Sequence, residues 1–334
     1  MRSVDRQAEL KQWIEARLNS VPVTLAPASA DASFRRYFRV HGAAETLIAM
    51  DAPPEHEDCR PFVRIAKLMA DAGLNVPRVI AEDIPRGFLL LTDLGTAGYL
   101  QALNNDSANE LFRDAIDALL RWQLASRPDV LPAYDRALLT RELRLFPDWY
   151  VVRHRGITLT AAQNTALDSI FELILANNLA QPPVYVHRDY MPRNLMVCEP
   201  NPGVLDFQDA VYGPITYDLA SLFKDAFISW DEERVLDWTI RYWEKAKRSG
   251  LPVAADFADF YRDFEWMGLQ RHLKVLGIFA RLNYRDGKPA YLEDTPRFIK
   301  YVRAVANRYA ALRPLTQLLD DIEGESTTTV GYTF

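Results

Sequence analysis

Three polar residues within one short stretch have the types and spacing that phosphoryl transfer needs. Asn194 follows Asp189 by five residues, and Asp206 follows it by seventeen. One carboxylate can meet the hydroxyl group of an acceptor, while an amide and a second carboxylate can hold Mg²⁺ against phosphate oxygens. We therefore expect Asp189 to be the catalytic residue, and Asn194 and Asp206 to be magnesium ligands.

Short strands must position these three side chains. Apolar runs predict such strands on both sides of the polar turn, at 184–186, 195–197 and 204–207. In an alternative interpretation, His187 and Asp189 merely cap a turn and Asp206 is solvated. That alternative suits each residue taken alone, but not the ordered set with apolar strands around it.

Two further residues are expected to support this loop rather than to react. His187 precedes Asp189 by two residues and is expected to be a buried, hydrogen-bonding strut. Asp218 lies where a helix is expected to begin, and two roles stay open for it. It either caps that helix or braces the catalytic loop.

The remaining pattern predicts an α+β protein of two lobes. Residues 1–93 combine a first helix, four strand candidates and one helix between them, whereas 94–325 is mostly helical. A short linker near 91–95 is expected to join the lobes. The segment 326–334 has no periodic pattern and is expected to be a mobile tail.

Composition excludes several classes of protein. The chain of 334 residues is long enough for two buried cores, and its formal net charge of −6 offers no basic excess for general nucleic-acid binding. No apolar run has the length of a membrane span, and Cys59 and Cys198 form no metal-spaced cluster. We expect a cytoplasmic monomer that binds neither nucleic acid nor membrane.

The motifs resemble those of the aminoglycoside phosphotransferase/choline kinase family, whose members share the protein-kinase-like fold. The matching segments are Ala32-Ser33-Phe34-Arg35-Arg36-Tyr37-Phe38-Arg39, His187-Arg188-Asp189-Tyr190-Met191-Pro192-Arg193-Asn194, Leu205-Asp206-Phe207-Gln208-Asp209-Ala210 and residues 213–222. The spacing of the three polar residues also matches the catalytic loop and metal-binding Asp of kinases. The likeness covers nearly the whole chain and looks closest to bacterial N-acetylmuramate/N-acetylglucosamine anomeric kinases.

The resemblance implies a function for each lobe. Residues 1–93 would bind the nucleotide, and 94–325 would carry catalysis and the substrate. ATP and Mg²⁺ are the implied cofactors, and the implied reaction is phosphorylation of an amino sugar at its anomeric C1 hydroxyl, in peptidoglycan recycling. Adenine is expected at the linker, through backbone groups near Leu91, Thr92 and Asp93.

The chain departs from the family pattern where phosphates are usually held. Met50 stands where a strand lysine is expected, the helix predicted at about 61–72 contains no Glu to pair with it, and no glycine-rich loop is present. We expect Ser33, Arg35 and Arg36 to take this role, with a guanidinium forking onto phosphate oxygens. The alternative is that both arginines are solvated on an edge strand.

The acceptor pocket is expected beside Asp189, within the helical lobe. Aromatic and charged side chains suit a sugar, and an arginine suits a carboxylate such as the lactyl group of N-acetylmuramate. The candidate substrate contacts are Asp189, Gln208, Asp209, Glu142, Trp149 and Arg271. A core role for Trp149 and a surface role for Arg271 are the alternatives.

Two other functions stay open. A kinase of an aminoglycoside, choline or another amino alcohol needs an acidic pocket for a cation, and the arginine-rich segment 141–155 argues against one. An ATP-binding pseudokinase would explain the missing lysine, yet all three polar residues of the catalytic set are present. A P-loop enzyme is excluded because the motif G-x-x-x-x-G-K-[ST] is absent.

Overall fold

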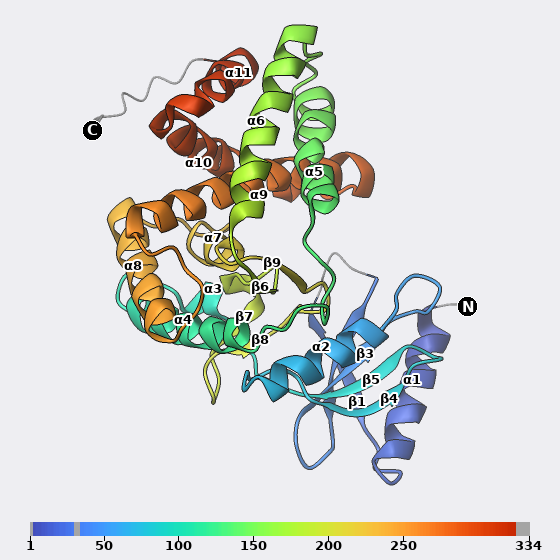
Figure 1. Ribbon diagram of the computed structural model, residues 1–334. Coiled ribbons are helices and arrows are strands. Elements are labelled where there is room, and N and C mark those ends of the chain that lie inside the picture. The colour runs from blue at the N-terminus through green and yellow to red at the C-terminus, as the bar shows by residue number, and fades with distance from the viewer. Residues whose placement is uncertain (1–2, 30–33, 325–334) are drawn as a thin grey trace. The chain divides into compact units, whose positions relative to one another are not determined.

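The computed structural model describes residues 3–29 and 34–324, which form two compact units (Figure 1). The first unit contains Met1–Trp122 and Arg193–Ala210, and the second contains Gln123–Pro192 and Val211–Phe334. Ser33 and the tail expected at 326–334 lie outside the described residues. The division into lobes near residue 93 stays a prediction.

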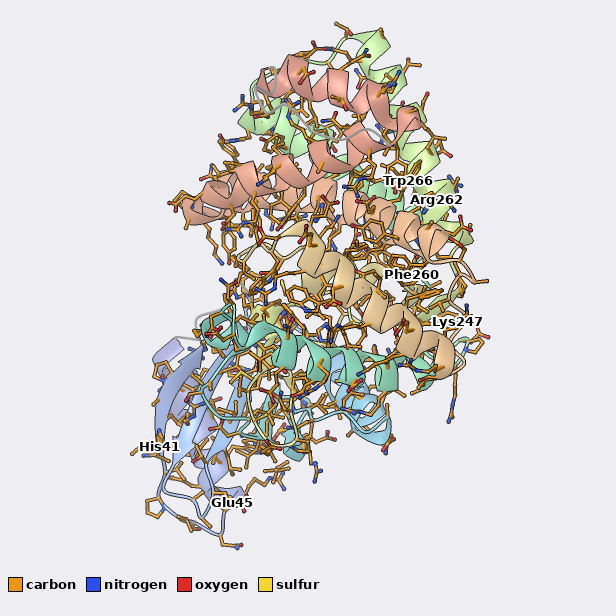
Figure 2. All side chains as sticks on the ribbon, turned by 90° about the vertical axis from the view of Figure 1, so that its left-hand side faces the viewer. His41, Glu45, Lys247, Phe260, Arg262 and Trp266 are labelled. Carbon is orange, nitrogen blue, oxygen red and sulfur yellow. The ribbon has the colours of Figure 1, made fainter. Side chains whose placement is uncertain are left out.

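Five antiparallel strands form the sheet of the first unit, in the order β1-β2-β3-β5-β4. From β1 to β5 their bounds are Thr24–Ser29, Arg36–His41, Leu47–Asp51, Val79–Asp83 and Phe88–Thr92. His41 and Glu45 mark the hairpin between β2 and β3 in Figure 2. The sequence pattern predicts β2 to β5 at these places, but it does not predict β1.

The sheet has two faces with different surroundings. Helix α1 (Ser3–Arg17) packs apolar side chains against one face, in a core that includes Phe38 of β2 and Ala49 of β3. Because successive side chains of a strand alternate, Tyr37 and Ile48 point to the opposite face. Tyr37 and Ile48 on that opposite face line a cavity.

Short elements complete the first unit. They are α2 (Arg60–Asp71), α3 (Tyr99–Ala102), α4 (Ala108–Leu124, whose last two residues belong to the second unit), β7 (Leu195–Met196) and β8 (Gly203–Val204). The helix predicted at 61–72 is confirmed as α2, and it ends before Gly73, whose φ of +81° suits a glycine after a helix. The β7–β8 pair carries the chain from Asn194 to Asp206.

The second unit is mainly helical. Its helical segments are α5 (Arg136–Leu145), the π-helical η1 (Phe146–His154), α6 (Ala161–Ala180), α7 (Tyr217–Phe223), α8 (Glu232–Arg248), α9 (Phe257–Asp286), η3 (Pro289–Asp294), α10 (Thr295–Arg308), η4 (Ala310–Leu312) and α11 (Arg313–Glu323). The strands β6 (Pro183–Val186) and β9 (Val211–Pro214) form one antiparallel pair. A strand-rich unit and a helical unit confirm the predicted α+β class.

Local signals in the sequence account for several of these helices. The sequence Thr160-Ala161-Ala162-Gln163 has the pattern of a capping box and forms one at the start of α6: the Thr160 hydroxyl accepts from the backbone N–H of Gln163, while the Gln163 side chain accepts from the backbone N–H of Thr160. Within residues 3–29 and 34–324, none of the helices combines the length and hydropathy that a bilayer crossing requires.

Helix α9 runs through the second unit and packs against α5, η1, α7 and α10. It carries Phe260 and Trp266, both buried (Figure 2). At Gly277 the helix passes so close to α5 that an added Cβ would lie 2.3 Å from the backbone C and O atoms of Leu145. A glycine at this position therefore allows α5 and α9 to approach each other closely.

Candidate active site

A cavity of about 390 Å³ lies against the sheet face opposite α1, within the first unit. Tyr37 and Arg39 of β2, Ile48 of β3 and Leu91 of β5 line it. Its other lining residues come from α2, the segment after β5, and 193–207, and they include Phe62, Thr92, Asp93, Arg193, Asn194, Asp206 and Phe207. A cavity of this size that combines apolar side chains with converging polar groups is typical of a small-molecule site.

The three residues expected near adenine line this cavity together, namely Leu91, Thr92 and Asp93. The Asp93 carboxylate accepts from Nε and Nη2 of Arg39, at 2.7 and 3.1 Å, and Nη2 also donates to the carbonyl of Gly95 at 2.9 Å. The Asp93 side chain is thus engaged with Arg39. A nucleotide at this position would meet backbone groups, as the resemblance implies.

The two expected magnesium ligands also lie together at this cavity. Asn194 Nδ2 is 3.5 Å from Asp206 Oδ2, and Leu205 N donates to the carbonyl of Asn194 at 2.9 Å. Gln208 Nε2 donates to Asp206 Oδ1 at 2.8 Å, so this predicted substrate residue orients the carboxylate. Asp206 has a φ of +60°, which costs a non-glycine residue about 1–2 kcal/mol and is common at functional sites.

This Asn–Asp pair fits a magnesium ion that takes its other oxygens elsewhere. Among the described residues, no group of three or more His, Cys, Asp or Glu side chains is arranged for a metal. Mg²⁺ is usually held by one or two carboxylates together with water and phosphate oxygens, and an amide oxygen is an acceptable ligand. Asn194 and Asp206 therefore suit a metal that arrives with a nucleotide.

The arginines expected to hold phosphates are engaged with carboxylates. Arg35 forms an ion pair with Glu57 at 3.1 Å, and Arg36 pairs with Asp51, which is fully buried. Neither arginine is among the residues that line the cavity. Their role in binding phosphate stays a prediction.

Two other arginines line the cavity, and sequence reasoning did not select them. Arg39 comes from β2, two residues after Tyr37 and on the same face of the strand. Arg193 is exposed and directly precedes Asn194. The alternation of side chains along β2 could have identified Arg39 as a cavity residue. Arg193 could have been identified because it is adjacent to the proposed metal ligand Asn194. Met50, which stands where a strand lysine was expected, is fully buried in β3.

The catalytic loop of the second unit is held by hydrogen bonds to its backbone. Asp218 accepts from the backbone N–H groups of His187 and Arg188, at 2.7 and 3.0 Å. The N–H of Asp189 donates to Nδ1 of the buried His187 at 3.2 Å, and the carbonyl of Asp189 accepts from Met191 N at 2.9 Å. Asp189 thus lies in a loop whose path is held on both sides.

Asp218 braces this loop and does not cap its helix. Helix α7 has its N-cap at Thr216, so the cap expected as one alternative for Asp218 is wrong. Burial raises the pKa of Asp218 to about 7, against the opposing effect of the N–H groups of His187 and Arg188. The cost of burial is larger than the gain from these hydrogen bonds.

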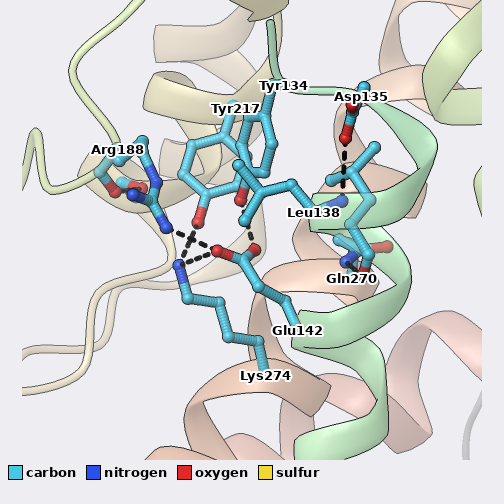
Figure 3. Close-up of polar contacts among 10 residues, drawn as sticks. Tyr134, Asp135, Leu138, Glu142, Arg188, Tyr217, Gln270 and Lys274 are labelled. Atoms are coloured by element: carbon cyan, nitrogen blue, oxygen red, sulfur yellow. Dashed lines mark hydrogen bonds and ion pairs between the residues drawn. The ribbon is translucent and has the colours of Figure 1, made fainter. Parts of the chain in front are cut away.

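Glu142, a predicted substrate contact, is buried at the centre of a charged cluster (Figure 3). Arg188 Nη2 lies 2.6 Å and Lys274 Nζ 3.1 Å from its Oε1, while the Tyr134 hydroxyl donates to Oε2. Burial alone would raise the pKa of Glu142, but the charges of Lys274 and Arg188 hold it below its usual value. This carboxylate is therefore ionised and paired in the absence of any ligand.

The other expected substrate residues are more dispersed. Arg271 is buried, and its Nη2 lies 3.7 Å from Sδ of Met191 in the catalytic loop. Trp149 is partly exposed on η1, and Asp209 is exposed. Asp189 belongs to the second unit, whereas Asn194 and Asp206 belong to the first, so the convergence of these three side chains stays a prediction.

Two full-length relatives have closely similar sequences. A model of the Phosphotransferase enzyme family matches residues 24–257. The N-acetylmuramate/N-acetylglucosamine kinase of Pseudomonas putida is 52% identical, with 95% of this chain and 97% of the relative covered. The protein of the same name from Pseudomonas aeruginosa is 55% identical, with 89% and 88% covered.

Solved structures share the fold at much lower identity. Choline kinase from Cryptosporidium parvum has a TM-score of 0.62 at 12% identity, with 93% of this chain and 99% of that chain covered. The streptomycin–ATP complex of the phosphotransferase APH(2″)-IIa has a TM-score of 0.57 at 15% identity, with 91% and 97% covered. The protein-kinase-like fold and the family expected from the motifs are thereby confirmed: this chain belongs to the phosphotransferase enzyme family.

Proposed function

We propose that this chain is an ATP- and magnesium-dependent kinase of amino sugars. It transfers the γ-phosphoryl group of ATP to the anomeric C1 hydroxyl of N-acetylmuramate or N-acetylglucosamine, in the recycling of cell-wall sugars. The observation that carries this proposal is the identity above 50% to kinases of that name over nearly the whole chain. An enzyme that uses ATP in this way would act in the cytoplasm, and its oligomeric state stays a prediction.

Asp189 is the proposed base or orienting group for the acceptor. The C1 oxygen of the sugar attacks the γ-phosphorus, the bond to the bridging oxygen of ADP breaks, and the hydroxyl proton passes to the Asp189 carboxylate. An anomeric hydroxyl is more acidic than an ordinary alcohol because the ring oxygen withdraws electron density. Orientation by Asp189 is therefore at least as important as its basicity.

The nucleotide is proposed to occupy the cavity of the first unit. Adenine would lie near the backbone of Leu91 to Asp93, and Asn194 and Asp206 would hold the metal, which neutralises charge on the phosphates when bound. Arg193 lines the same cavity and could reach phosphate oxygens. It would supply the positive charge that Met50 does not.

Arg271, a buried cation near the catalytic loop, favours a neutral or anionic acceptor over a cation. Arg188 and Lys274 lie in the same unit, but Glu142 pairs with both of them. Arg271 touches the loop at Met191 and has a buried Nη1 without a hydrogen-bond partner among the described residues. It is the proposed contact for the lactyl carboxylate of N-acetylmuramate.

An assay of ADP formation with a panel of acceptors tests the proposal. The panel contains N-acetylmuramate, N-acetylglucosamine, choline and streptomycin, each with MgATP. Turnover is expected with the two acetylated sugars and not with the two cations. Turnover with a cation alone would replace the proposal by an amino-alcohol or aminoglycoside kinase, and ATP binding without turnover on any acceptor would indicate a pseudokinase.

A further inference from the structure

Arg188, which directly precedes Asp189, has a left-handed backbone. Its φ is +76°, which a non-glycine residue rarely adopts unless its surroundings enforce it. The adjacent backbone is held by Asp218, and Ser221 Oγ donates to the carbonyl of Arg188 at 3.4 Å. These contacts hold the backbone on both sides of the Arg188 side chain.

The Arg188 guanidinium is held by a buried carboxylate and a buried ring. Its Nη2 donates to Oε1 of Glu142 at 2.6 Å, and its central carbon lies 5.5 Å from the ring centre of Tyr134. Glu142 is only 5% exposed and Tyr134 only 2%. A charge-assisted hydrogen bond with so little water around it is strong and directional.

Glu142 also binds a second cation. Lys274 Nζ lies 3.1 Å from its Oε1 and donates to the Tyr217 hydroxyl at 3.0 Å. Tyr134, Glu142, Arg188, Tyr217 and Lys274 together form what we term the Glu142 cluster (Figure 3). It connects the catalytic loop to α5, α7 and α9.

The close approach of α5 and α9 at Gly277 makes this cluster possible. Leu145, which an added Cβ at Gly277 would meet, lies three residues after Glu142, and Lys274 lies three residues before Gly277. Residues three apart on a helix lie on the same side of it. The glycine therefore brings the Glu142 and Lys274 side chains within reach of each other.

Such a cluster is an expensive way to build a stable core. It removes one carboxylate and two cations from water, and apolar side chains of the same volume are often at least as stabilising. The position of the cluster indicates a role in catalysis, because its member Arg188 directly precedes Asp189. The Asp189 carboxylate is also close enough for its charge to act on Lys274.

We propose that the Glu142 cluster positions Asp189 for phosphoryl transfer, with Arg188 as the positioning residue and Glu142 as its anchor. The inference rests on the proposed function, in which Asp189 meets the acceptor hydroxyl. A misplacement of about 1 Å can cost about 100-fold in rate. The cluster is therefore expected to affect kcat and to leave ATP binding, which the proposal assigns to the first unit, unchanged.

Three substitutions of Arg188 separate its side chain from its backbone. Arg188→Gly removes the anchored side chain but tolerates the positive φ, Arg188→Ala removes it and keeps the strain, and Arg188→Lys keeps a cation within reach of Glu142. With N-acetylmuramate as acceptor, kcat is expected to fall about 100-fold in the Gly and Ala variants and no more than about 5-fold in the Lys variant. KM for ATP is expected to stay within about 2-fold of the wild-type value.

Glu142→Gln tests the anchor, and Glu172→Gln is its matched control. Glu172 pairs with Arg136 at 2.8 Å on the surface of the same unit, where both side chains are more than half exposed. Glu142→Gln is expected to lower kcat by about 10- to 100-fold, whereas Glu172→Gln leaves it unchanged. If Glu142 acts on catalysis only through Arg188, kcat of the Glu142→Gln/Arg188→Ala double variant is no lower than that of Arg188→Ala alone.

Thermal unfolding and ATP binding are measured on every variant beside its kinetics. A wild-type protein that turns over no amino sugar overturns the proposed function and this inference with it. An active wild-type protein whose Arg188→Gly variant keeps its kcat within about 2-fold overturns the positioning role alone. Equal losses of kcat, ATP affinity and thermal stability also overturn it, because that pattern reports a purely structural role.

Discussion

The cavity of the first unit and the Glu142 cluster of the second unit use charge in opposite ways. The cavity is lined by apolar and polar side chains, among them the exposed Arg193 and the partly exposed Arg39. In the cluster, Glu142 and Lys274 are almost inaccessible to water, and each has at least two polar partners. The cavity thus has one cation at the surface and one paired with Asp93, whereas the cluster binds all its charges to each other.

This difference matches two demands of a kinase reaction. A nucleotide and its metal must enter and leave, and an exposed cation such as Arg193 can meet phosphate oxygens at little cost in desolvation. A catalytic carboxylate must instead be in place before the acceptor arrives, which a buried and fully paired network achieves. Substitutions in the first unit should therefore act on ATP affinity, and substitutions around the catalytic loop should act on kcat.

The largest effect is expected for Asp189→Asn. The amide keeps the size of the side chain but cannot accept the hydroxyl proton, so kcat should fall about 1,000-fold while ATP binding stays unchanged. Steady-state kinetics and calorimetric titration with ATP measure the two effects separately. Asp168→Asn, which breaks the exposed pair with Arg144, serves as control. Loss of ATP affinity in Asp189→Asn would indicate a structural role for this residue.

A smaller effect is expected for Asp206→Ala. Removal of this carboxylate should weaken Mg²⁺ binding and lower kcat/KM for ATP about 100-fold, because charge on the phosphates is no longer neutralised in place. Titration of the rate with MgCl₂ should show a higher half-saturating concentration than in the wild-type protein. An unchanged magnesium dependence would remove Asp206 from the metal site.

Arg193→Met sharpens the assignment of cations in the cavity. If Arg193 contacts phosphate oxygens, its loss should raise KM for ATP about 10-fold, equivalent to about 1.4 kcal/mol, with kcat changed much less. Arg113→Met, on an exposed face of α4, is the matched control. The same assay on Arg35→Ala and Arg36→Ala tests the hypothesis that these two arginines hold the phosphates. If KM for ATP rises only in these two variants, the phosphates are held by Arg35 and Arg36 and not by Arg193.

The last effect is on stability, not on turnover, and concerns pH and Asp218. Its folded-state pKa, which burial raises to about 7, lies above the value of about 3.9 for an unfolded chain. The folded state therefore binds this proton more tightly, and the stabilisation is complete below about pH 4 and is lost as pH rises through about 7.

An Asp218→Asn variant has no proton to lose at this position. Between about pH 4 and pH 7 the wild-type protein should lose up to about 1.4 kcal/mol of unfolding free energy per pH unit relative to the variant. Urea unfolding at pH 5, 6, 7 and 8 measures this difference. Parallel stability curves for the two proteins would show that Asp218 keeps an ordinary pKa.

Short-range patterns explain why much of the fold was predictable. Alternation predicts β2 to β5, and the period of α2 together with Gly73 predicts where that helix lies and ends. Strand β1 was not predicted because it contains Pro27, a residue that argues against a strand. Proline is tolerated here because β1 lies at an edge of the sheet.

The candidate site was predictable only where its residues are close in sequence. Asp189, Asn194 and Asp206 stand out by their order and spacing within one stretch. The pairing of Arg39 with Asp93 spans 54 residues, and that of Arg188 with Glu142 spans 46, so no local pattern reveals either. Glu142 was selected as a substrate contact for its charge, but that charge is engaged by partners that only the folded chain brings near.

Identification of the phosphorylated atom tests the central claim most directly. Purified protein is incubated with MgATP and N-acetylmuramate, and the product is examined by proton-coupled ³¹P NMR. The account predicts a new phosphomonoester signal coupled to the anomeric proton, as a sugar 1-phosphate requires. A phosphoester coupled to the C6 protons, or no phosphoester while the sugar and ATP stay intact, would contradict it.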